Sequence, residues 1–462
     1  MLTLTKREIQ SVFKQLNRRV QIKVQAKKEV TRPASQLDWS SLWRKEDWWS
    51  VWLGFIILVL VSTGIITWLP KIGTWTTDVS RAFSVGLEYF IILFVGLLTL
   101  ASVGVIGMKE NVKSFAIGFP IIFILAFLSF LITGQKTLGK DYGLEFPLWA
   151  LVLGLLISNT VGTPKWLKAA AKTELFIKIG LVLLGAEILF HKILAAGAYG
   201  MLQAIIVVLS VFYFCYLFAT KVLKIERRFA SILSTGVSIC GVSAAIAAGG
   251  AVKGDPKQVS YTVSLVLLLA IPMLVFMPFI ARVLEMPDAV AGAWLGGTID
   301  TTPAVVAAGA LYSKKAMDVA AIVKMSQNVL IGVWAFALAL YFVTKVERKA
   351  REANPSPLEI WYRFPKFILG FIIASLVVSL LFVPALGAKQ VDGIVGITGG
   401  FRAWWFAMGF VSIGLGTNFV ELMKIGKGRP FAAFSIAQIF NIFLTLFLAY
   451  IIFGGIIIPP PY

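Results

Sequence analysis

The sequence predicts an all-α polytopic membrane protein with about 13 transmembrane segments. Of its 462 residues, 58% are hydrophobic and only 14% are charged, and the mean hydropathy is +0.85. This composition excludes a soluble globular domain. Apolar windows of about 20 residues, the length that crosses a bilayer, lie near 51–69, 86–107, 113–133, 143–160, 172–190, 199–220, 229–252, 257–281, 288–311, 318–343, 365–385, 400–421 and 430–453.

These windows divide the chain into four parts. Residues 1–50 form a basic cytoplasmic tail, and 51–112 hold two additional N-terminal transmembrane helices. Residues 113–453 are expected to form the core, and 454–462 an external C-terminal tail. Apolar and basic side chains alternate at helical spacing in the first tail, which predicts an amphipathic helix on the anionic membrane surface.

The charge distribution predicts the orientation. Lysines and arginines are more frequent in alternate loops, and the positive-inside rule places those loops and the N-terminus in the cytoplasm. The loop 344–364 is then cytoplasmic and Tyr462 external, in a bacterial-type inner membrane. The net charge of +20 therefore predicts contact with membrane lipids and does not indicate nucleic-acid binding.

The segment 292–309 carries polar groups at membrane depth. Thr298, Asp300, Thr301 and Thr302 follow a Gly-Gly pair and precede a proline. A carboxylate in a bilayer is costly unless it faces a cavity or a partner, and irregular backbone is tolerated there only where it lines protein or water. We therefore expect a broken helix with a binding site. The alternative is a proline-kinked structural span in which the acid pairs with a neighbour.

A second glycine-rich segment covers 234–254. Backbone N–H groups at the start of a half-helix, aided by Ser238 and Ser243 and lying beside Cys240 and Gly241, could hold an anion. The alternative is close helix packing through small residues.

Three further charges lie in apolar spans. Lys178 and Glu187 are nine residues apart, on opposite faces of a helix, and should not pair. Lys324 lies one span after Asp300, and a pair between them could be opened by a proton, a cation or an anion. The alternatives for Lys324 are a permanent structural pair or a side chain that extends to the interface.

The segments 177–188 and 406–417 form a weak internal repeat with similar glycine offsets. They should cross the membrane in opposite directions, as inverted repeats of transporters do. Packing glycines could produce the same likeness by chance.

The sequence gives little support for an enzyme. Cys215 and Cys240 lie in apolar segments and His191 is the only histidine, so no metal site, disulfide or cofactor is expected. Ser238 has no candidate base nearby in sequence. No phosphate-binding loop is present, so transport should be driven by an ion gradient. A membrane sensor or structural protein, with the basic tail as its output, is the hypothesis of another class.

Four motifs resemble the landmarks of the YeiH-type inner-membrane proteins, the sulfate exporter family. They are Ser-Ile-Cys-Gly at 238–241, Val-Val-Ala-Ala-Gly at 305–309, Lys-Met at 324–325 and Gly-Leu-Gly-Thr at 414–417. The resemblance covers about 113–453. It implies membership of the cation:proton antiporter/anion transporter superfamily, with an inverted-repeat core and broken, crossed helices. The implied substrate is a small anion, sulfate or an organosulfur anion.

The chain departs from the family pattern at three places. Relatives carry a His-Glu pair where Asp300 and Thr301 stand, and Thr-Glu-Pro where 248–250 reads Ala-Gly-Gly. A family arginine is replaced by Gln327, while Lys324 and the basic position matched by Lys178 are retained. The substrate and the coupling ion therefore do not transfer directly from the family.

We predict a secondary transporter that exports or exchanges a small anion by alternating access. A proton or sodium ion is the expected coupling partner, and a homodimer is an assembly that the sequence leaves open. The alternative within transport is a cation/proton antiporter centred on Asp300, with Lys324 as the competing charge. The candidate ion-coupling residues are Asp300, Thr302 and Asn328. The candidate substrate-binding residues are Ser238, Cys240, Gly241, Ser243, Thr298, Thr301, Lys324, Lys178 and Thr417.

Overall fold

The computed structural model of the chain describes residues 39–141, 145–188, 190–342, 361, 364–420 and 428–455. The predicted amphipathic helix of the tail, most of the loop 344–364 and Tyr462 lie outside these residues. The regular secondary structure of the described residues is helical, with two isolated β-bridges. Eight of its helices are long and apolar enough to cross a membrane. The polytopic helical class is confirmed, whereas the count of about 13 spans is not.

Several helices begin at residues that satisfy the free N–H groups of a first turn. Asn111, Asp255 and Ser313 each accept a hydrogen bond from the backbone two or three residues on. The principal helices are α2 (Glu46–Ser62), α3 (Leu87–Gly107), α4 (Val112–Gly134), α5 (Phe146–Thr160), α6 (Lys165–Ala170), α7 (Thr173–Glu187), α8 (Phe190–Leu217), α9 (Arg227–Ser238), α10 (Gly241–Ala251), α11 (Pro256–Val283), α12 (Asp288–Thr298), α13 (Thr302–Tyr312), α14 (Lys314–Tyr341), α16 (Lys366–Leu376), α17 (Val383–Leu386), α18 (Ala388–Gly416) and α20 (Gly428–Phe453).

Both glycine-rich segments are broken, as predicted, and each forms a helical hairpin. In the first hairpin (α9 and α10), Arg228 near the start of α9 donates a hydrogen bond of 3.1 Å to the Lys253 carbonyl just after α10. In the second hairpin (α12 and α13), Ser313 after α13 donates to Asp288 at the start of α12 at 2.5 Å. The two ends of each segment therefore lie together, and both segments re-enter instead of crossing.

Re-entry changes the predicted topology in only a few places. The 28-residue helix α11 separates the bases of the two hairpins, so the hairpins enter from opposite sides. Arg282 hydrogen-bonds the Leu311 and Tyr312 carbonyls at the base of the second hairpin. With both hairpins re-entrant, the loops at the two ends of α11 lie on the opposite sides from those that 13 crossing spans would give, and the predicted sides of the segments beyond the two hairpins are unchanged. The family resemblance implied that broken helices cross. In this structure the tips of two re-entrant hairpins meet instead.

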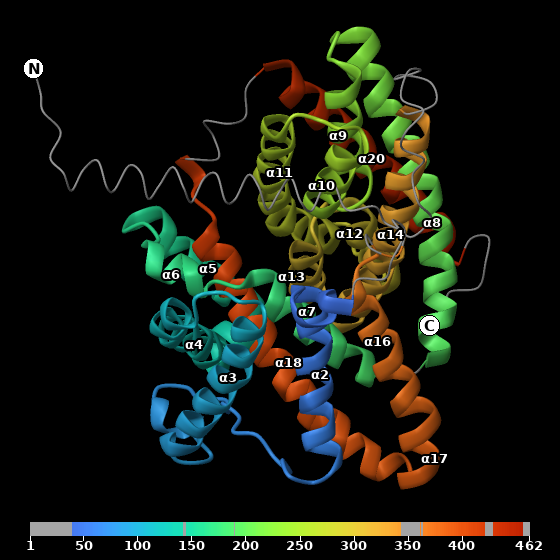
Figure 1. The fold of residues 1–462 in the computed structure, drawn as a ribbon. Helices are drawn as coiled ribbons and strands as arrows, with labels where there is room; N and C mark the ends of the chain where they lie inside the picture. The colour runs from blue at the N-terminus through green and yellow to red at the C-terminus, as the bar shows by residue number, and fades with distance from the viewer. Residues whose placement is uncertain are drawn as a thin grey trace, which may run out of the picture.

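The helices form two bundles (Figure 1). The scaffold bundle comprises α2 to α7, α16 and α18, with α18 packed on α5 and α7. The hairpin bundle comprises α8 to α14 and α20, with α14 packed on α8, α12 and α13. Helix α13 touches α5, α7 and α18 and so links the bundles.

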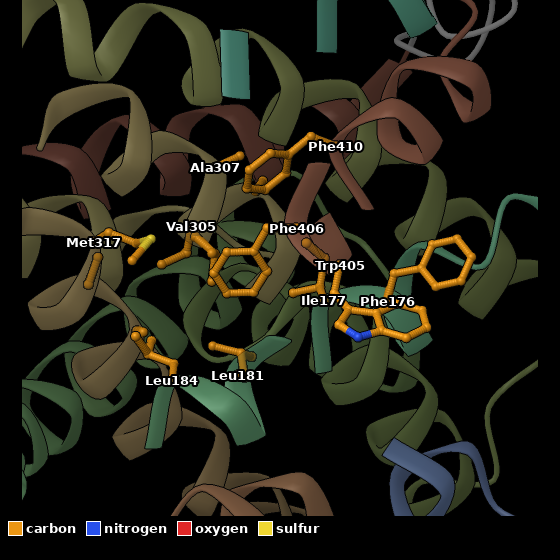
Figure 2. Close-up of a cluster of buried hydrophobic side chains, with 14 of the residues drawn as sticks. Phe176, Ile177, Leu181, Leu184, Val305, Ala307, Met317, Trp405, Phe406 and Phe410 are labelled. Atoms are coloured by element: carbon orange, nitrogen blue, oxygen red, sulfur yellow. The ribbon is translucent and has the colours of Figure 1, made fainter. Parts of the chain in front are cut away.

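The contact between the bundles includes a group of apolar side chains. Figure 2 shows Phe176 and Leu181 of α7, Val305 of α13, and Phe406 and Phe410 of α18 in one cluster. All five side chains are at most 1% exposed. The cluster contains no polar pairs, and apolar contacts are not directional. It therefore does not hold the two bundles in one alignment through directional bonds.

The two segments of the predicted repeat pack directly on each other. Gly180 of α7 lies against the ring of Phe406 of α18, and Gly409 of α18 lies against Ile177 of α7. In the repeat, Ile177 corresponds to Phe406 and Gly180 to Gly409, so the contact is reciprocal. The partners run in opposite order along the two helices, which are therefore antiparallel. Reciprocal contacts of this kind are those that a two-fold axis generates.

A second pair of contacts obeys the same relation. Ser158 of α5 donates to the Thr417 carbonyl after α18 at 2.6 Å, and Ser375 of α16 donates to the Ile188 carbonyl after α7 at 2.5 Å. In the repeat, Ile188 corresponds to Thr417, so α5 and α16 occupy equivalent places. A Phe-Pro pair marks the start of each helix: residues 146–147 are the first two of α5, and residues 364–365 directly precede α16. The sequence analysis missed this signal. These contacts support an inverted repeat.

Candidate functional site

The tips of the two hairpins meet in the hairpin bundle. The Cys240 sulfur, immediately before α10, lies 4.0 Å from the hydroxyl of Thr302, the first residue of α13. No side chain of the preceding residue caps either helix, both of which are 11 residues long. The first N–H groups of a helix have no partner within it and carry the positive end of its dipole. Two such ends therefore converge at the tips.

Lys324 of α14 lies beside the same junction. Its ammonium donates to the Ile239 carbonyl at 2.6 Å and to Gln327 Oε1 at 3.0 Å. The residue is 1% exposed, so the lysine does not extend to the interface. Two of its three hydrogens are used, and one donor remains for a ligand.

The C-terminal ends of the half-helices, in contrast, are capped by side chains. Lys324 satisfies the carbonyl that follows α9. Gln327 donates to the Gly297 carbonyl at 3.0 Å, and Gln438 of α20 donates to the Thr298 carbonyl at 2.9 Å. The backbone carbonyls at these ends are thus satisfied, whereas the first backbone N–H groups of α10 and α13 have no side-chain cap, which favours an anion.

Asp300 lies between α12 and α13 and is 1% exposed. Its Oδ2 atom accepts no hydrogen bond from the described residues. The expected ion pair with Lys324 is not formed, because no nitrogen of Lys324 lies within 4.0 Å of the carboxylate and its ammonium is bound to Ile239 and Gln327. The two charges still interact electrostatically. The structural alternative of a permanent pair between them is therefore not supported.

A cavity of about 280 Å³ separates the junction from the scaffold bundle. On the hairpin side, Cys240, Ser243, Thr301, Thr302 and Asn328 line it, and Asn328 donates to the Thr302 hydroxyl at 3.0 Å. On the scaffold side it is lined by the starts of α2, α7 and α16, including Lys45, Glu46, Asp47, Glu174, Lys178 and Lys366. The structure therefore brings half of the predicted site residues to one cavity.

Lys178 lines this cavity on the scaffold side and is held by acidic side chains. Its ammonium lies 2.9 Å from Asp47, 3.0 Å from Glu46 and 3.4 Å from Glu174. Three carboxylates compensate its charge, so Lys178 is less suited than Lys324 to bind an anion. As predicted, it does not pair with Glu187.

The other predicted residues occupy different places. Ser238 and Gly241 are buried at the first tip, and neither they nor Lys324 and Asp300 line the cavity. Thr298 is bonded to Thr445 of α20 and to the Trp294 carbonyl. Thr417 caps α18 in the scaffold bundle, where its hydroxyl donates to the Ile413 carbonyl at 2.7 Å. The structure thus does not bring Thr417 to the hairpin tips.

Residues that the sequence analysis missed complete the surroundings of the second tip. Gln203 of α8 donates to the Ala293 carbonyl at 2.9 Å, and Asn441 of α20 donates to the Thr298 carbonyl at 3.3 Å. The sequence did contain a signal, because each residue is an uncharged amide within an otherwise apolar span. A single amide changes the mean hydropathy of such a span too little to be noticed.

Comparisons with known proteins identify relatives. The family described as "Conserved hypothetical protein 698" matches residues 117–433. A membrane protein of Rhodopirellula baltica, UPF0324 membrane protein RB9488, is 42% identical over 83% of this chain and 72% of its own length. A UPF0324 membrane protein of Nitratidesulfovibrio vulgaris is 41% identical over 78% of this chain and 63% of its own length, so this chain spans just under two thirds of it.

A third relative, UPF0324 membrane protein NE0724 of Nitrosomonas europaea, is 30% identical over 84% of this chain and 92% of its own length. No solved structure matches the chain. The matched region contains both hairpins and Lys324, and the resemblance inferred from the motifs is confirmed. The chain belongs to the UPF0324 family of membrane proteins, the YeiH-type family.

Proposed function

We propose that the protein is a secondary transporter of a small anion, sulfate or an organosulfur anion, working by alternating access. The observation that carries the proposal is the junction of two uncapped half-helix starts with the Lys324 ammonium. Backbone N–H groups and one ammonium suit the oxygens of a sulfate or sulfonate group. The cavity of about 280 Å³ that reaches this junction fits a small solute.

The position of the cavity supports an inward-open state. Its lining includes Lys45 to Asp47 at the start of α2 and Lys366 at the start of α16. Both segments were predicted to be cytoplasmic from the distribution of basic residues. The hairpin tips, about 11 residues from their bases, line the same cavity as these helix starts of the scaffold bundle. A displacement of the hairpin bundle along the scaffold would expose the tips to the other side.

Ion pairs close the opposite side. Glu187 at the end of α7 is bound by Arg402 of α18 and lies 3.3 Å from Lys314 at the start of α14. The Glu187 side chain is only 5% exposed. These residues connect the scaffold bundle to the base of the second hairpin. We propose that they hold the outer side closed in the inward-open state.

This closure predicts a sided reactivity for Cys240, which lines the cavity. In a Cys215→Ser background, Cys240 is the only thiol. An anionic, membrane-impermeant methanethiosulfonate should label it from the cytoplasmic side. Glu187→Gln should raise labelling from the outer side severalfold, because it weakens the attachment of Arg402 and Lys314. Glu88→Gln, at an exposed site on the same side, should leave the labelling unchanged.

A labelling pattern that does not depend on Glu187 would show that its ion pairs have only a structural role. Labelling of Cys240 from the outer side alone in the unaltered chain would reverse the proposed inward-open state.

The orientation is a separate prediction. A cysteine placed at Asn354, within the loop 344–364, should react with an impermeant reagent only from the cytoplasmic side of inner-membrane vesicles. The basic residues of this loop determine the expectation. Labelling from the outer side in intact cells would overturn the whole proposed topology, with both termini reversed.

The alternative is a cation/proton antiporter centred on Asp300, and the unpaired Oδ2 atom of this buried carboxylate favours it. The experiment that decides between the two is thermal unfolding of the purified protein against a panel of anions. A bound anion raises the unfolding temperature as its concentration exceeds the dissociation constant. Saturable stabilisation by sulfate or a sulfonate supports the anion transporter. Stabilisation by cations alone would support the antiporter.

A further inference from the structure

Buried oxygen atoms gather around the second hairpin tip and accept no hydrogen bond from any residue that the structure describes. Each belongs to a residue that is at most 3% exposed. Native proteins leave few buried polar atoms unpaired, and each calls for an explanation. The atoms are Gln203 Oε1, Asp300 Oδ2, Asn328 Oδ1, Gln438 Oε1 and Asn441 Oδ1.

The orientation of the two α20 amides follows from their nitrogens. Gln438 Nε2 and Asn441 Nδ2 donate to the same acceptor, the Thr298 carbonyl oxygen, at 2.9 and 3.3 Å. Because a carbonyl can only accept, the nitrogen of each amide must face it, and the amide is not reversed. The two amide oxygens are therefore held beside one peptide, with no donor among the described residues.

The electrostatic character of this place is negative. Thr298 ends α12, and the C-terminal end of a helix carries the negative end of its dipole. Asp300 lies two residues further along the tip. The nearby Lys324 ammonium instead donates to Ile239 and Gln327. Carbonyl and carboxylate oxygens without competing donors are the ligands that hard cations prefer.

We propose that Gln438, Asn441 and Asp300 bind a sodium ion beside the second hairpin tip. With only one carboxylate among the oxygens, the site favours a monovalent cation over a divalent one. Unwound backbone and the C-terminal ends of half-helices serve the same purpose in other transporters. Gln203, whose Nε2 caps the Ala293 carbonyl at 2.9 Å, supplies a further oxygen from α8.

The site also explains how the two ligands would be linked. The second hairpin presents the start of α13 to an anion and the end of α12 to a cation, so occupation of both ends neutralises the tip. A coupling role for the sodium ion rests on the proposed transport function. The binding of the ion can be measured without transport.

The test uses the purified full chain and sodium chloride as the probe. Its unfolding temperature should rise saturably in sodium chloride, but not in choline chloride or potassium chloride at the same ionic strength. Equal unfolding temperatures in the three salts would overturn the site. The response of the unfolding temperature to sulfate, measured with choline as the cation, tests anion binding separately. A protein that responds to sulfate but not to sodium contradicts the sodium site and leaves the proposed anion transport standing.

Two substitutions locate the ion. Gln438→Met and Asn441→Leu should each raise the sodium concentration at half-effect by about tenfold, equivalent to about 1.4 kcal/mol, while the sulfate response remains. Gln258→Met, which removes an isolated buried amide oxygen of α11, should change neither response.

A wild-type sodium response in both variants would place the ion elsewhere. If either variant fails to fold, Asp300→Asn provides the second readout. It keeps the side-chain shape and removes the negative charge, and it should weaken sodium binding; an unchanged sodium response in this folded variant would contradict the proposal.

Discussion

Lys324→Met is expected to abolish anion-dependent stabilisation while leaving a folded protein. Methionine keeps the apolar stem and removes the ammonium that lies at the junction of the hairpins. A hydrogen bond to a charged group contributes about 1.5–3 kcal/mol, so anion affinity should fall at least about tenfold. Loss of the bonds to Ile239 and Gln327 should itself lower the free energy of unfolding by about 1–3 kcal/mol.

The measurement is the unfolding temperature with and without sulfate. Lys172→Met is the matched control, because this lysine is paired with Glu110 in the scaffold bundle, away from the cavity. The control should retain the full sulfate response. An unchanged response in Lys324→Met would remove this lysine from the site and leave its role as a cap of the α9 end.

Asp300→Asn is expected to separate binding from coupling. Asparagine keeps the volume of the side chain and fixes it in the neutral state. The anion should still bind, because the half-helix starts and Lys324 remain. Accumulation driven by a proton or sodium gradient should fall to the level of protein-free liposomes, while anion exchange persists.

The measurement is uptake of labelled sulfate into proteoliposomes under an imposed gradient, followed by exchange at equilibrium. Asp392→Asn, at an exposed acid of α18, should accumulate sulfate like the unaltered protein. If Asp300→Asn liposomes still concentrate sulfate along the gradient, Asp300 is a structural residue and the coupling mechanism is wrong.

The helix breaks could be predicted from the sequence, whereas the course of the chain through them could not. Gly296, Gly297 and Pro303 interrupt the helical ladder locally, and this effect depends only on neighbouring residues. Whether the second half-helix continues or returns depends on tertiary contacts such as that of Ser313 with Asp288. Both segments also contain enough apolar residues to fill a full hydropathy window, so they were counted as spans.

The candidate site shows the same division. Lys324, Cys240 and Thr302 were recognisable because polar groups in apolar segments require a local reason. The partners of Lys178 were not, because Glu46 and Asp47 lie more than 130 residues away in the chain. Gln438 and Asn441 carry no charge, and their importance follows from one shared acceptor, the Thr298 carbonyl.

The proposed mechanism requires that a small anion bound at the hairpin junction crosses the membrane. The decisive measurement is exchange of radiolabelled sulfate in proteoliposomes, with an alkanesulfonate as the competing solute. We expect saturable exchange that the sulfonate inhibits and that is lost in Lys324→Met. Proteoliposomes of the folded, unaltered protein that exchange neither anion faster than protein-free liposomes would contradict it.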